Sequence, residues 1–209
     1  MNYKENFKEG IYHEIGHALA TIVEYEDDNR LSSIKMKKKD NGSYGFVTNW
    51  NSGPLLKDKN ELLSLTVVAF AGSVFQQMIS CYSSYVKGRL CFNLIERLVS
   101  LFNKKHALQM FFERHVAERN EGMLQDLALI TVVYEKYQEA GFIKHQLNEL
   151  KAKNDTIKVL LPFVEATEIH ELADYCLKVF WYCGMAGGSE AEVDANTIKE
   201  FLGNLFKGK

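Results

Sequence analysis

The feature that most constrains this chain is His13-Glu14-Ile15-Gly16-His17, an H-E-x-x-H motif that leads into an apolar run. Residues four apart lie on one face of a helix, about one turn from each other, so both imidazoles can bind one Zn²⁺. Glu14 then lies beside the metal and can accept a proton from a water molecule. A chance H-E-x-x-H is expected in roughly one of a hundred such chains, so the motif needs support from its surroundings.

The surrounding residues predict a helix over residues 9–24. Apolar side chains recur there at helical spacing and form one face: Ile11, Ile15, Ala18, Leu19 and Ile22. The two histidines flank this face, at the edge of a buried stripe. Gly16 costs about 1 kcal/mol relative to Ala in a helix interior, so we expect another element to pack closely there. The simpler alternative is two ordinary histidines on a surface helix.

Length and composition bound the class of protein. The chain has 209 residues, of which 46% are hydrophobic and 25% charged, as in an ordinary soluble globular protein. We therefore expect a single domain over residues 1–209. The formal net charge of −2 does not indicate nucleic acid or an anionic membrane as the main partner. A basic run over residues 35–39 predicts either contact with an acidic partner or a solvated strand.

The chain has no sequence signal for secretion or for a membrane anchor. It begins with the polar segment MNYKENFKEG, and its longest apolar stretch, residues 62–75, is too short to span a bilayer. Its cysteines form no C-x-x-C pair and are expected to be free thiols. We therefore expect a cytoplasmic protein with no membrane segment.

Hydrophobic periodicity predicts a mainly α-helical fold. A small β-hairpin is expected after the first helix, with strands over residues 33–38 and 43–48 around the turn Asp40-Asn41-Gly42. Residues 61–80 are apolar on nearly all sides, which is typical of a helix central to the core. We expect further helices over residues 89–102, 105–118, 122–139, 141–153, 157–164, 168–183 and 195–206, a loop over 49–59 and a glycine-rich joint over 184–189.

A catalytic zinc usually has three protein ligands and one open position, so a third ligand must come from elsewhere in the chain. The metzincin pattern is excluded, because Ala20 and Val23 stand where it requires Gly and His. Asp126 is the best candidate, because it shares a helical face with apolar residues and a buried carboxylate needs a cation or metal. On spacing alone, a salt bridge or a favourable charge at a helix N-terminus explains Asp126 equally well.

Four segments together resemble the peptidase domain of the FtsH family of ATP-dependent zinc proteases, peptidase family M41. Residues 12–19, YHEIGHAL, are similar to the family's Y-H-E-A-G-H-A-L, and residues 43–48, SYGFVT, resemble its strand pair ending in a G-Y-T-like sequence. Residues 69–73, AFAGS, resemble its L-x-A-G-R helix, and residues 125–127, QDL, resemble its N-D-L. The matches follow the family's order within residues 8–140, whereas residues 141–209 show no clear match.

The resemblance implies a helical zincin-type peptidase domain with the small hairpin beside the active site. It implies that His13, His17 and Asp126 bind Zn²⁺ and that Glu14 is the general base of a metallo-endopeptidase. The substrate would be an unfolded or extended polypeptide that adds to the hairpin edge through main-chain hydrogen bonds. By the same resemblance Phe46 and Val47 lie in or beside that edge, although ordinary hairpin packing explains them at least as well.

The chain also departs from the family's pattern. Gln76 and Gln77 stand where the family has acidic residues, Ser73 replaces an Arg, and the stretch between Gly72 and Asp126 is longer than usual. No G-x-x-x-x-G-K-S/T motif occurs, so this chain alone is not expected to hydrolyse ATP. The candidate partner is therefore a separate AAA ATPase. The resemblance is also compatible with a homo-oligomer.

Two other functions remain open on the sequence. The domain could be a catalytically silent, peptidase-like binding or regulatory module that works with a separate AAA ATPase, although such a module has no need of Glu14. It could also be a helical interaction protein without a metal. The remaining histidines lack a partner at ligand spacing and are expected to lie on the surface or at the edge of the core: His106, His115, His145 and His170.

Overall fold

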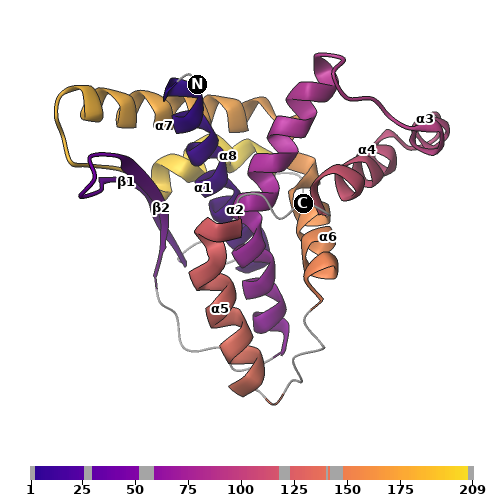
Figure 1. Cartoon of the computed structure of the whole chain (residues 1–209), viewed down its shortest axis with the longest axis horizontal. Coiled ribbons are helices and arrows are strands. Elements are labelled where there is room, and N and C mark those ends of the chain that lie inside the picture. Colours follow the sequence, from indigo (N-terminus) through magenta and orange to yellow (C-terminus); the bar gives the residue numbers. More distant parts are fainter. Residues whose placement is uncertain are drawn as a thin grey trace.

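A computed structural model describes residues 3–25, 30–51, 59–117, 123–139, 141 and 148–206. The fold is mainly helical with a small three-stranded antiparallel sheet. In Figure 1 the helices α1 (Tyr3–Tyr25), α2 (Lys59–Val86) and α5 (Met123–Glu139) form the centre of the molecule. The sheet lies at one side of them, and α3 (Leu94–Ser100) and α4 (Lys104–Phe112) project at the other.

Helices α1 and α2 pack closely against each other, as the glycine in the motif predicted. A Cβ atom at Gly16 would lie 2.5 Å from the Ala71 carbonyl oxygen and 2.7 Å from the Phe75 Cβ, so only glycine fits there. The apolar face predicted for α1 is confirmed, because four of its members are fully buried and the fifth, Ile22, is partly buried: Ile11, Ile15, Ala18 and Leu19.

Helix α2 is the central core helix that its all-round apolar sequence predicted. Among the described helices, only its Glu61–Val86 part is long and apolar enough to cross a membrane. The most apolar window of this part is 72% buried inside the protein. Helices α1, α5 and α6 (Glu149–Leu160) pack around it.

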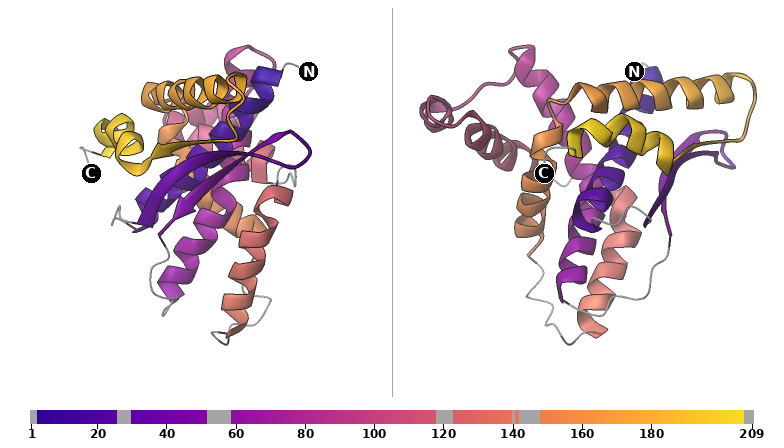
Figure 2. Two further views of the ribbon diagram at one scale, coloured as in Figure 1. Left: turned by 90° about the vertical axis from the view of Figure 1, so that its left-hand side faces the viewer. Right: turned by 180° about the vertical axis from the view of Figure 1, so that it is seen from behind.

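The predicted hairpin is confirmed as β1 (Leu31–Lys38) and β2 (Tyr44–Trp50), and a third strand, β3 (Glu190–Asp194), extends it to the order β2-β1-β3. Figure 2 shows the sheet against one side of α1. Strand β3 was not predicted, because its acidic sequence EAEVD has low strand propensity. Its carboxylates neutralise the basic run on β1, since Lys35 and Lys37 each lie 3.3 Å from a glutamate of β3, Glu192 and Glu190.

The C-terminal helices agree with prediction in part, because residues 141 and 148 lie outside any helix and residues 161–163 form the 3-10 turn η4. Helices α7 (Thr167–Met185) and α8 (Ala195–Phe206) confirm the helices expected over 168–183 and 195–206. The break expected between 153 and 157 is wrong, because α6 runs through it. The Thr156 hydroxyl donates to the Ala152 carbonyl at 2.8 Å, which satisfies its polar group inside the helix. Part of the helix expected over 141–153, residues 142–147, and most of the loop expected over 49–59, residues 52–58, lie outside the described residues.

Helix α3 is shorter than the predicted 89–102, whereas the helix predicted over 105–118 is confirmed over its described residues, which are helical to residue 117. Gly88 has a positive φ of 70°, and Asn93 forms a capping box with Glu96, so α3 begins only at residue 94. Asn103 caps α4, which continues into the π-helical turn η2 (Glu113–Ala117). Asn93 therefore gives α3 a later start than periodicity predicted, and Asn103 separates α3 from α4 where the break was predicted.

Glu96 attaches α3 to the rest of the protein. Its side chain is 1% exposed and accepts hydrogen bonds from Arg114 Nε at 2.8 Å and Nη2 at 2.7 Å. Burial by itself raises the pKa of Glu96, but the bonds from Arg114 and from the Asn93 backbone outweigh burial and lower this pKa overall. The ionised carboxylate is therefore the form that stabilises the fold.

Replacing Glu96 with Gln should lower the free energy of unfolding by about 1–2 kcal/mol near neutral pH, because a charge-assisted pair is lost. The folded pKa of Glu96 lies below its ordinary value of 4.5, so its contribution is present above that value and is lost as pH falls through the folded pKa. Urea unfolding at about pH 7 and about pH 3 measures this. The difference between wild type and variant should shrink at the lower pH, and an equal difference at both would contradict the assignment.

Candidate metal centre

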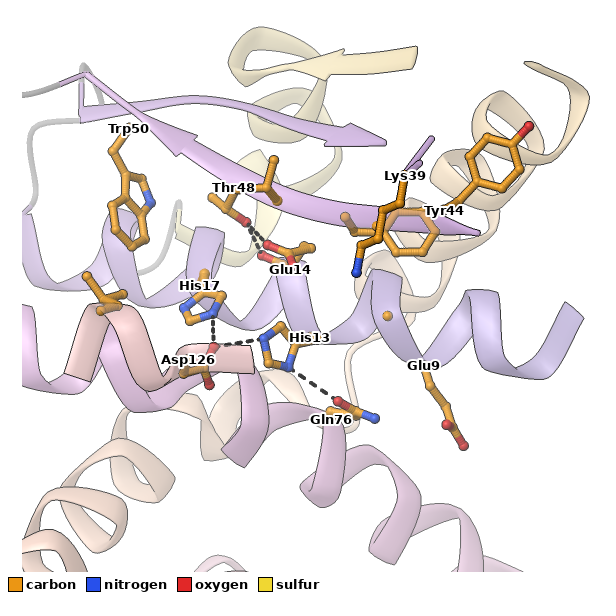
Figure 3. A pocket seen from close by; sticks show the side chains of 15 residues that line it. Glu9, His13, Glu14, His17, Lys39, Tyr44, Thr48, Trp50, Gln76 and Asp126 are labelled. Carbon is orange, nitrogen blue, oxygen red and sulfur yellow. Dashed lines mark hydrogen bonds and ion pairs between the residues drawn. The ribbon is translucent and has the colours of Figure 1, made fainter. Parts of the chain in front are cut away.

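The predicted ligands come together although they are distant in sequence. His13 and His17 extend from α1 toward Asp126 in the first turn of α5 (Figure 3). Asp126 Oδ1 lies 2.9 Å from His13 Nε2 and 3.0 Å from His17 Nε2, across a sequence separation of 109 residues for the second pair. All three side chains are buried. The expected partner of the buried Asp126 carboxylate is therefore the histidine pair.

This group could hold a metal ion. The three ligand atoms lie within 4.8 Å of one another, and within the described ranges no other set of three His, Cys, Asp or Glu residues forms such a group. Two imidazole nitrogens and one carboxylate oxygen suit Zn²⁺ and also Fe²⁺. Ligands about 2.1 Å from a tetrahedral ion are about 3.4 Å apart, so the ligand atoms need to separate only slightly to admit one.

Hydrogen bonds on the opposite ring nitrogens orient both histidines. His17 Nδ1 lies 2.8 Å from the Val68 carbonyl oxygen and donates to it. His13 Nδ1 lies 3.3 Å from the amide oxygen of Gln76. Because each Nδ1 carries the proton, each Nε2 of a neutral ring has its lone pair free for a metal. Gln76, a departure from the family's pattern, thus orients a predicted ligand.

The charges of the group favour a cation at its centre. Burial by itself raises the pKa of Asp126, but hydrogen bonds from His13 and His17, and their charges, hold this pKa well below its usual range. Burial lowers the pKa of His17, but the bond to Asp126 and the charges of Asp126 and Glu14 raise it overall. A metal ion would replace the protons on the two Nε2 atoms and compensate the same buried carboxylate.

Gly72 of α2 makes room for the ring nitrogens. A Cβ atom at this position would lie 2.4 Å from His17 Nε2 and 2.6 Å from His13 Nε2. Beside it, the Ser73 backbone nitrogen lies 3.3 Å from Asp126 Oδ2 and donates to it. The short segment AFAGS therefore supplies both the space and a backbone donor for the group.

Glu14 turns away from the ligands toward the sheet. Its side chain is buried, and the hydroxyl of Thr48 on β2 lies 2.8 Å from Glu14 Oε2 and 2.9 Å from the Glu14 carbonyl oxygen. The hydroxyl proton can be donated to either oxygen, so Thr48 ties the Glu14 carboxylate to the strand (Figure 3). A carboxylate held in this way can act as a proton acceptor in the cleft.

An open cleft of about 620 Å³ lies over the group, between α1 and β2. Both predicted substrate contacts line it: Val47 is 47% exposed, whereas Phe46 packs against Phe7 and Phe180 with ring centroids 5.1 and 5.6 Å apart. Phe46 therefore belongs largely to the core, as hairpin packing predicted, and substrate contact stays a prediction for both. The ring of Trp50, 6.0 Å from that of His17, closes one end of the cleft.

Sequence reasoning missed the roles of four residues around the group: Thr48, Trp50, Gly72 and Gln76. Gly72 and Thr48 lie in segments that carried the resemblance, and a glycine inside a fully apolar helix was a usable signal of close approach. Trp50 and Gln76 had no such signal, because their positions beside the histidines depend on how β2 and α2 pack on α1.

Comparison of the chain with protein-family models, with curated proteins and with solved structures finds no match. The likeness to the FtsH family therefore rests on the motifs and stays a prediction.

Proposed function

We propose that this domain is a zincin-type, zinc-dependent metallo-endopeptidase similar to the M41 peptidases. The observation that carries the proposal is the buried group of His13, His17 and Asp126 with Glu14 beside it in the same cleft. A group that served only the fold would not need a further carboxylate on the wall of the same cleft. Hydrolysis uses such a carboxylate as a base, which favours Zn²⁺ over Fe²⁺ for this ligand set.

Each residue of the cleft would have a separate role in the proposed hydrolysis. Bound Zn²⁺ would supply a Lewis acid that polarises the scissile carbonyl and lowers the pKa of water. Glu14 would accept the proton of the attacking water and return it to the leaving amine nitrogen. Thr48 would keep the Glu14 carboxylate on the cleft wall, at 2.8 Å from its hydroxyl.

The edge of β2 supports an extended substrate. Strand β2 pairs with β1 on one side, and no described strand pairs with its other side. A peptide that adds to such an edge is held by main-chain hydrogen bonds, which give affinity with little sequence preference. We therefore propose unfolded or extended segments of proteins as substrates, with a separate AAA ATPase as the candidate that would deliver them.

Metal content and hydrolysis test the proposal together. Elemental mass spectrometry of the chain, purified without chelator, should find about one zinc per chain, falling below about 0.2 in Asp126→Ala. The zinc-loaded chain should cleave an unfolded casein substrate, and a chelator should stop the reaction. Zinc without cleavage, even with AAA ATPases added, would favour the silent binding module. A different metal in the same stoichiometry would contradict the assignment of zinc.

A further inference from the structure

The segment between α2 and α4 exposes an unusual set of large apolar side chains. The exposed fractions are 74% for Leu94, 61% for Ile95, 55% for Leu98, 76% for Leu101 and 91% for Phe102. These five residues form what we call the α3 apolar face. In Figures 1 and 2, α3 and α4 extend from the body on the side away from the sheet. The α3 apolar face is therefore at a protruding edge of the molecule and remote from the candidate metal centre.

Three of the five side chains share one side of α3, because Leu94, Ile95 and Leu98 at i, i+1 and i+4 cover an arc of about 100°. Leu101 and Phe102 follow in the turn at the C-terminal end of this helix. Glu96 is on the opposite side, buried and bonded to Arg114. The helix is thus reversed relative to an ordinary surface helix, with its charged side toward the protein and its apolar side toward solvent. Because the bonds between Glu96 and Arg114 hold α3 in this orientation, the apolar face is exposed in the folded protein and is expected to have a binding partner.

Basic side chains accompany the α3 apolar face along the sequence. All of these side chains are exposed: Lys87, Arg89, Arg97, Lys104 and Lys105. Lys104 also contacts Glu165 of a neighbouring turn at 3.0 Å, and Arg97 Nε donates to the Phe92 carbonyl. Between residues 86 and 112 the sequence contains a single acidic residue, the buried Glu96. This segment is therefore strongly positive at its surface, although the whole chain has a net charge of −2.

We propose that the α3 apolar face docks on an anionic lipid bilayer. Apolar side chains inserted at the boundary between headgroups and hydrocarbon, with Lys and Arg at the level of anionic headgroups, are the two features that bind a protein to a membrane surface. A second copy of this chain fits less well, because a two-fold contact through the face would oppose two positive segments. The inference is independent of the proposed peptidase function, since it uses no residue of the metal centre.

Sedimentation of the full chain with lipid vesicles tests the proposal. Phosphatidylcholine vesicles with about 30% phosphatidylserine should bind the chain at least about tenfold more tightly than pure phosphatidylcholine vesicles, and added salt should weaken binding. The double variant Leu101→Ser/Phe102→Ser should bind at least about tenfold more weakly, because it removes the two most exposed apolar side chains. Both positions are exposed, so the variant should fold as the wild type does.

Tyr182→Ser/Met185→Ser is the matched control, because these side chains are 70% and 72% exposed and belong to the last turn of α7, the end that leads to the sheet and away from α3 (Figure 1). It should bind vesicles as the wild type does. Unchanged binding of the α3 variant, or no binding of the wild type to anionic vesicles, would overturn the proposal. Analytical ultracentrifugation without lipid tests whether a second copy of this chain covers the α3 apolar face instead. If the wild type self-associates and the α3 variant is monomeric, the face is an interface between copies and the lipid proposal fails.

Discussion

Glu14→Gln is expected to slow peptide hydrolysis by about 10²–10⁴-fold while about one zinc per chain remains bound. The amide keeps the size of the side chain and can still contact the Thr48 hydroxyl. In the wild-type structure this hydroxyl lies 2.8 Å from Glu14 Oε2. It cannot accept a proton from water at neutral pH, so only the proton transfer is lost. The loss should therefore fall on kcat, with KM little changed.

Glu9→Gln provides the matched control for this experiment. Glu9 is on the same helix and lines the same cleft, but it does not lie between the two histidines. The control removes an equal charge from the cleft and should retain most of the activity. A Glu14→Gln protein that cleaves at the wild-type rate would show that Glu14 is not the base. A fall of similar size in Glu9→Gln would show that the charge of the cleft, rather than proton transfer, limits the reaction.

Gly72→Ala is expected to weaken zinc binding by at least about 10–100-fold and to lower the melting temperature by several degrees. The added methyl group would lie 2.4 Å from His17 Nε2 and 2.6 Å from His13 Nε2, which is far inside van der Waals contact. The buried rings must move away from Asp126, so the three ligand atoms can no longer bind one metal ion together. Overpacking costs about 1–3 kcal/mol, and the higher helix propensity of Ala offsets about 1 kcal/mol of that.

Gly203→Ala is the control for the Gly72 substitution. Gly203 is also inside a helix, α8, and a Cβ atom there has no neighbour within 4 Å. The same change should therefore raise the free energy of unfolding by about 0.5–1 kcal/mol and leave zinc binding unaltered. Thermal unfolding and zinc titration on both variants measure the two effects. Normal zinc affinity in Gly72→Ala would contradict the geometry of the candidate metal centre.

The two histidine ligands could be predicted from a short-range regularity. His13 and His17 are four residues apart on one helix, so helical geometry alone brings their rings together. Asp126 required more, because it lies on another helix. Its place on an apolar helical face indicated burial, and burial of a carboxylate indicated a cationic partner. The structure confirms that partner as the histidine pair.

The errors have a common physical origin in non-local packing. Strand β3 forms where a segment more than 150 positions away pairs with β1 and buries Val193, with the glutamates of β3 beside Lys35 and Lys37. Helix α6 continues through a polar stretch because α2 packs along it and Thr156 bonds within the helix. The net charge of the whole chain likewise gave no sign of the basic segment around α3, residues 86–112, because a sum over all residues does not record where the charges lie.

By itself, the sequence determined the helical class, the hairpin, the buried α2 and the two candidate histidine ligands. These follow from periodicity and from residue types, which act over a few positions of the chain. For Asp126, residue spacing left a salt bridge or a helix-end charge equally open, and the resemblance to the M41 peptidases favoured a ligand. Only the tertiary structure decided that Gln76 and Val68 orient the ligand rings, that Thr48 holds Glu14, and that Gly72 gives the rings space. It also decided that α3 turns its apolar side outward while Glu96, on its inner side, bonds to Arg114.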